Sequence, residues 1–102
     1  MINTNIKNSH LRIENLFKSI FTEVPNTSIS LNEESVIIEH KDQSNPDAAS
    51  IEIIKLEEVY KISYWDGYSL AEDETEKDLN KALKIFKRFS KKMAKNLIRF
   101  SN

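Results

Sequence analysis

The chain contains no cysteine, a single glycine and two prolines among its 102 residues. Without cysteine it has no disulfide, no thiolate nucleophile and no zinc site built from thiolates. One glycine excludes the glycine-rich loops that hold phosphates in nucleotide-binding proteins. The longest apolar run is three residues, far short of the roughly 20 that span a bilayer, and residues 1–10 do not resemble a signal peptide. We therefore expect a cytoplasmic protein.

Acidic and basic residues are unevenly distributed along the chain. The net charge is −1, yet residues 1–78 contain all 16 acidic residues and 7 basic ones, a balance of −9. Residues 79–102 contain 8 basic residues and no acidic one, a balance of +8. The molecule is a charge dipole, and we expect it to present two surfaces of opposite sign.

Apolar periodicity predicts a helix at each end of the chain. Residues 11–24 repeat apolar side chains at steps of three and four, and Pro25 excludes further helix. Residues 75–100 form a longer stripe of the same period, and Thr75 followed by Asp78 predicts its N-terminal cap. The apolar positions of this second stripe are Leu79, Ala82, Leu83, Phe86, Phe89, Met93, Leu97 and Phe100.

Between the two helices the period changes to two, which is typical of strands. The expected strands are residues 28–31, 36–40, 51–56 and 59–65, with a loop over 42–50. The segment 51–56 is apolar on both faces and predicts a central strand or one with a bulge. Asp66-Gly67 predicts a hairpin with a two-residue type I′ turn that places Trp65 opposite Tyr68; the alternative is an extended link over residues 68–74.

These elements predict one α+β domain over residues 1–102. It has an N-terminal helix, an antiparallel sheet of three to five strands and a long C-terminal amphipathic helix packed on the sheet. Both helices should cover the same face of the sheet, because each has one apolar side to bury.

The C-terminal helix carries a row of cations opposite its apolar face. We call this row the basic stripe: Lys77, Lys81, Lys84, Arg88, Lys91, Lys95 and Arg99. Like charges four residues apart destabilise a helix by about 0.2–0.5 kcal/mol per pair, so the stripe is either a solvated face or a binding surface. Because it points away from the core, we expect that acids of the sheet do not neutralise it.

Sites for metals, cofactors and catalysis are not predicted. The acidic run Glu72-Asp73-Glu74 lacks the ligand spacing of a calcium loop, and acids close to a helix N-terminus stabilise it by about 0.3–1 kcal/mol each. His10 and His40 lie thirty residues apart with no paired spacing. No serine has a recognisable nucleophile context, so we expect a protein that is not an enzyme and needs no cofactor.

The stretch from Tyr60 to Tyr68 (YKISYWDGY) leads into the terminal helix. With the size and layout of the chain, it resembles the small bacterial immunity proteins that neutralise toxins of polymorphic or contact-dependent growth inhibition systems. The resemblance implies a protein-binding inhibitor that occludes the active site of a cognate toxin. A nuclease is one such toxin, whose basic surface the inhibitor's acids would oppose.

The predicted partner surface combines an aromatic anchor with an acidic rim. It consists of Trp65, Asp66, Tyr68, Glu72, Asp73 and Glu74. Strand alternation places Trp65 on the opposite side from Tyr60, Ile62 and Tyr64, so one of these aromatic sets lies outside the main core. The alternative is that Trp65 is itself a core residue.

Two other functions remain as hypotheses for the terminal helix. Nucleic-acid binding through the basic stripe is the first, although the balance of −9 in residues 1–78 repels a polyanion. Membrane association is the second, and it would expose the apolar stripe that the sheet requires. We therefore expect a protein partner, without a membrane.

Overall fold

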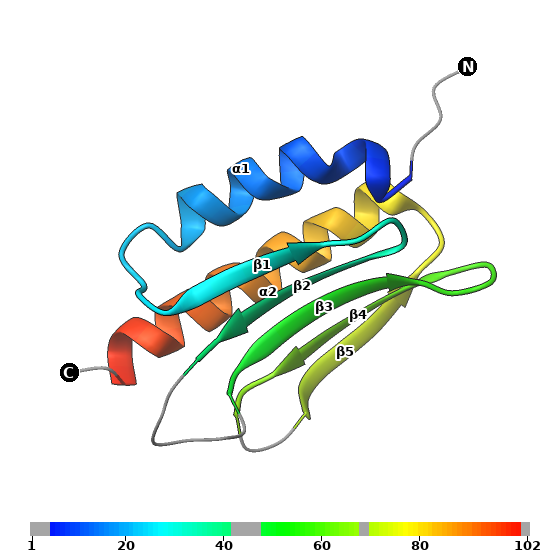
Figure 1. Ribbon diagram of the computed structural model, residues 1–102. Coiled ribbons are helices and arrows are strands. Elements are labelled where there is room, and N and C mark those ends of the chain that lie inside the picture. Colours follow the sequence, from blue (N-terminus) through cyan, green and yellow to red (C-terminus); the bar gives the residue numbers. More distant parts are fainter. Residues whose placement is uncertain (1–4, 42–47, 68–69, 101–102) are drawn as a thin grey trace.

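The computed structural model describes residues 5–41, 48–67 and 70–100, with the side chains of 70, 71, 99 and 100 left out (Figure 1). Its elements are η1 (Lys7–Ser9), α1 (His10–Ile20), β1 (Thr27–Leu31), β2 (Ser35–His40), β3 (Ser50–Lys55), β4 (Tyr60–Trp65), β5 (Leu70–Glu76) and α2 (Leu79–Phe100). The strands form one antiparallel sheet in the order β1-β2-β3-β4-β5. The two helices lie side by side on one face of the sheet (Figure 1). The predicted α+β fold is confirmed, with β3 as the central strand.

The core lies between the sheet and the two helices. Alternate residues of β2, β3 and β4 point to the helices and are almost fully buried: Val36, Ile38, Ile51, Ile53, Ile62 and Tyr64. From α2, Phe86, Phe89 and Met93 pack into the same cluster. Apolar side chains that recur every two residues in the strands therefore pack against apolar side chains that recur about every 3.6 residues in the helix, and together they form one layer.

The helix α2 begins at Leu79 rather than at the predicted Thr75. Its cap is Asp78, whose carboxylate accepts a hydrogen bond from the backbone N–H of Asn80 at 3.1 Å. The chain is still a strand at residue 76, because Glu76 pairs with β4. The acidic run at 72–74 consequently belongs to an edge strand, and the explanation through the helix dipole is wrong.

The hairpin between β4 and β5 is confirmed, but its predicted register is wrong. Trp65 is paired with Leu70 after a register shift at the end of β4. Gly67 has a positive φ of 102°, whereas Asp66 does not have the positive φ that a type I′ turn requires. Four residues thus separate the strands instead of two, and Tyr68 lies outside the described residues.

Candidate functional site

The face of the sheet opposite the helices is uncovered by any element of the described chain. Its side chains are short polar residues, three acids, one lysine and three large apolar residues. We call it the open face: Ser28, Ser30, Ser35, Ile37, Glu39, Ser50, Glu52, Ile54, Lys61, Ser63, Trp65, Asp73 and Thr75. The short serine side chains on this surface let another molecule approach the strands closely.

Trp65 is the largest side chain of the open face. It is the last residue of β4 and is partly exposed. Ser50 lies opposite it on β3, and Glu39 lies opposite Ser50 on β2. Adjacent strands lie about 4.8 Å apart, so Ser50 is too short to cover the indole. Trp65 is absent from the buried core of the described residues, and it points away from the layer that contains Tyr64.

The acids predicted to surround Trp65 are divided between the two faces of the sheet. Asp73 lies on the open face opposite Ser63, and its carboxylate is 4.0 Å from the Lys61 ammonium. Glu72 and Glu74, which alternate with it along β5, lie on the face that the helices cover. Only Asp73 of these three shares a face with Trp65.

Glu72 and Glu74 instead form ion pairs with α2. The Glu72 carboxylate is 2.6 Å from the Lys92 ammonium, and Glu74 pairs with the Arg88 guanidinium. Glu72 and Glu74 are two residues apart on a strand, about 6.6 Å, and Arg88 and Lys92 are four residues apart on a helix, about 6.0 Å. Because the two spacings nearly match, both ion pairs form at the same time. Arg88 of the basic stripe is therefore neutralised from the sheet, contrary to the prediction, because the stripe extends around α2 to the β5 edge.

Glu39 and Glu52 belong to the open face and were missed as candidates. Both are out of phase with the buried isoleucines of β2 and β3, so strand alternation alone places them on the uncovered side. Glu52 lies opposite Ser63, which is two residues before Trp65. The acidic surroundings of the indole thus come from three strands instead of one.

The remaining members of the basic stripe are distributed along α2 and the link before it. Lys77 precedes the helix, and Lys81, Lys84, Lys91 and Lys95 are exposed on it. Among the described residues these five form no ion pair. The side chain of Arg99 lies outside the described part of the chain.

Tyr64 and His10 each have a structural partner, whereas the buried Nδ1 of His40 has no hydrogen-bond partner among the described residues. The Tyr64 hydroxyl accepts a hydrogen bond from the Asn96 amide at 3.0 Å, and burial raises the pKa of Tyr64 although this bond opposes the rise. Nε2 of His10 lies 2.7 Å from the Asn32 carbonyl oxygen. His40 is the last residue of β2, as expected.

Neither a metal site among the described residues nor a similar protein indicates a function for this chain. Within residues 5–41, 48–67 and 70–100, no three histidine, aspartate or glutamate side chains are grouped to hold a metal ion. None of the described helices is long and apolar enough to cross a bilayer. Comparisons with models of protein families, with curated proteins and with solved structures gave no match.

Proposed function

We propose that the chain is a non-catalytic protein-binding module that docks a protein partner on its open face. The observation that carries the proposal is the partly exposed Trp65 on a sheet face that no described element covers. Tryptophan is among the residues that most often dominate the free energy of an interface. Ile37 and Ile54, also partly exposed, lie on the same face, where Glu52 and Ser63 separate them from Trp65.

The charges of the open face favour a basic partner. Glu39, Glu52 and Asp73 outnumber Lys61, which pairs with Asp73, and the exposed Asp66 follows Trp65 directly. Complementary charge would raise the association rate and exclude wrong partners more than it would raise affinity. Glu72 and Glu74 contribute little here, because they are engaged by α2.

In its specific form the proposal is an immunity protein that occludes the active site of a cognate bacterial toxin. A nuclease fits the charge, because its substrate-binding surface is basic in order to bind phosphates. The resemblance of the stretch from Tyr60 to Tyr68 supports this form. Steric coverage requires no reactive group in the inhibitor, so Trp65 would act as an anchor and the acids as a rim.

Replacement of Trp65 by alanine tests the proposal. With the partner purified from source cells, Trp65→Ala should weaken binding by at least about 2 kcal/mol, roughly 30-fold, and leave the urea melt nearly unchanged. The matched control is Leu11→Ala, which truncates an apolar side chain that is 70% exposed on α1 and should not alter binding. Trp65 is the single tryptophan of the chain, so its emission should shift to the blue on docking.

Two results would contradict the proposal at different levels. If Trp65→Ala unfolds the chain while affinity per folded molecule is unchanged, Trp65 is a structural residue and the open face is not the interface. If the partner binds through Trp65 but co-expression of the chain does not relieve any toxicity of that partner, the binding module stands and the immunity function is wrong.

A further inference from the structure

A groove runs between α1 and α2, in the layer opposite the open face. It contains two hollows in line, one of about 220 Å³ between residues 12–16 and 83–87 and one of about 450 Å³ between residues 19–20 and 91–98. Residue numbers increase from the smaller to the larger hollow on both helices, so α1 and α2 run parallel. The groove follows them for about 20 Å, since a helix rises 1.5 Å per residue.

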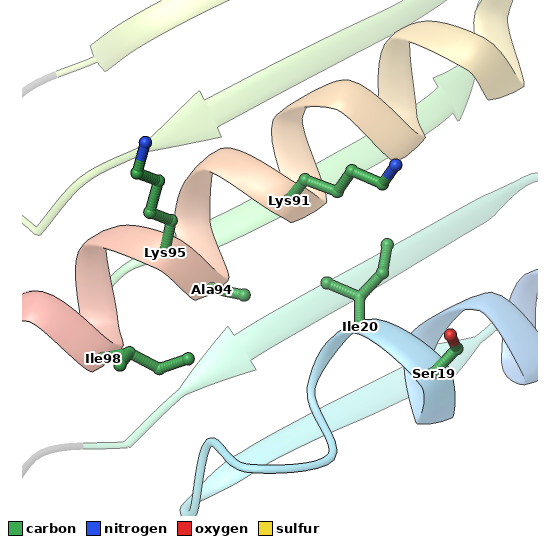
Figure 2. Close-up of a pocket in the computed structure, with 6 residues that line it drawn as sticks. All are labelled: Ser19, Ile20, Lys91, Ala94, Lys95 and Ile98. Carbon is green, nitrogen blue, oxygen red and sulfur yellow. The ribbon is translucent and has the colours of Figure 1, made fainter.

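The floor of the groove is apolar. In the larger hollow, Ile20 of α1 faces Ala94 and Ile98 of α2 (Figure 2). Ile98 is 42% exposed, whereas Ala94 and, in the smaller hollow, Leu83 are 4% and 5% exposed. The short side chain of Ala94 leaves space that an apolar side chain from another molecule can fill.

The rim of the groove is cationic. Five exposed side chains line the two hollows: Arg12, Lys84, Lys87, Lys91 and Lys95. None of the five takes part in an ion pair with a described residue. No acidic residue is among the described residues that line either hollow. The other edge of α2 differs, because Arg88 and Lys92 are paired there with acids of β5.

We propose that this groove binds an acidic amphipathic helix of a protein partner. Apolar side chains at spacing i, i+3 or i+4, and i+7 would enter the two hollows, and carboxylates flanking them would pair with the cations of the rim. Acidic ligands relieve the repulsion between like charges one turn apart on α2. The inference concerns a surface distinct from the open face and does not depend on the proposed function.

The burial of the floor favours a helix over a membrane or a nucleic acid. Leu83 and Ala94 are too buried to insert into a bilayer, but side chains of a docked helix can reach them. A nucleic acid would engage the cations through its phosphates and leave the apolar hollows unfilled. An acidic amphipathic helix satisfies both the buried floor and the cationic rim.

Two fluorescein-labelled helical peptides of about 16 residues, roughly the length of the groove, test the proposal. Both contain the same leucine, alanine and glutamate residues. One places its leucines on a single face and the other has a scrambled order. By fluorescence anisotropy at near-physiological salt, the patterned peptide should bind with a Kd of about 10 µM and at least about tenfold more tightly than the scrambled one.

Variants of the chain locate the binding. The double charge reversal Lys91→Glu/Lys95→Glu should weaken binding of the patterned peptide at least about tenfold. The matched control Lys77→Glu/Lys81→Glu reverses two exposed lysines that are also four residues apart but do not line the groove, and it should change the Kd less than about twofold. Ser19→Trp fills the larger hollow from its exposed edge and should abolish the preference for the patterned peptide.

Equal affinity for both peptides, or equal weakening by both charge reversals, would show attraction by charge alone and overturn the proposal. Absence of binding to the patterned peptide up to about 100 µM would do so too. Vesicles containing phosphatidylserine and a short DNA duplex are the further arms of the experiment. Tighter binding to either of them, lost in Lys91→Glu/Lys95→Glu, would assign the groove to lipid or nucleic acid.

Discussion

The packing of α2 on the sheet should depend strongly on Phe89. Its side chain is fully buried, and its ring lies 6.4 Å from the Tyr64 ring, measured between centroids. Phe89→Ala removes most of this contact surface and leaves a cavity between α2 and β4. Substitutions of this kind cost about 3–5 kcal/mol, and the lost aromatic pair accounts for about 0.5–1.5 kcal/mol beyond area burial.

This cost is a large part of the free energy of unfolding. Domains of this size are stable by about 5–15 kcal/mol, so we expect Phe89→Ala to remove about 4 kcal/mol. With a urea m-value of about 1.5 kcal/mol per M, the midpoint of a melt followed by circular dichroism should fall by about 2–3 M. Phe89→Leu, which keeps much of the volume, should cost about 1–2 kcal/mol.

Leu11→Ala is the control for hydrophobic truncation without burial. Leu11 is 70% exposed on α1, and its substitution should change stability by less than about 0.5 kcal/mol. If Phe89→Ala costs less than about 1 kcal/mol with an unchanged m-value, α2 does not cover the sheet in solution. The groove between α1 and α2 would then lose its structural basis as well.

Three further predictions concern single interactions. In a double-mutant cycle of Glu72→Gln and Lys92→Gln, the coupling energy should stay below about 1 kcal/mol and fall with added salt, because both side chains are partly exposed. Asp78→Ala should cost about 1 kcal/mol in a urea melt through loss of the α2 cap, and Asp78→Asn much less. Burial raises the pKa of Tyr64, so its phenol ionises at a lower pH in the unfolded chain than in the folded one. The free energy of unfolding should therefore fall as the pH rises above the ordinary tyrosine pKa of about 10. Urea melts of wild type and Tyr64→Phe across that range should show the smaller fall in the variant; equal falls would contradict a buried neutral phenol.

The periodicity of the sequence determined the element order and the burial of most side chains. The alternation of Tyr60, Ile62 and Tyr64 placed Trp65 on the opposite face of the strand, and the packing of the helices decided that Tyr60, Ile62 and Tyr64 are the buried set. The doubly apolar segment 51–56 predicted a central strand or one with a bulge, and β3 is the central strand of the sheet. Such inferences succeed because side-chain direction follows from backbone geometry over a few residues.

The sequence predicted element boundaries less accurately, because the same residues can belong either to a strand or to the helix that follows it. The sequence predicted Thr75 as the helix cap, with Asp78 as the acidic residue of a capping box. Hydrogen bonding of β5 with β4 extends the strand through Glu76 and leaves Asp78 as the cap. The hairpin register failed for a similar reason, since the geometry of the turn depends on the register shift at Trp65.

The pairing of charges was decided by the tertiary structure alone. The sequence separates acids from cations along the chain, yet Glu74 and Arg88 are 14 residues apart and meet because β5 and α2 pack antiparallel. The groove between α1 and α2 brings Arg12 close to the lysines of α2, from the opposite end of the chain. Periodicity determines which face of an element is polar, but which two polar faces become neighbours depends on how the elements pack, and that is a property of the whole fold.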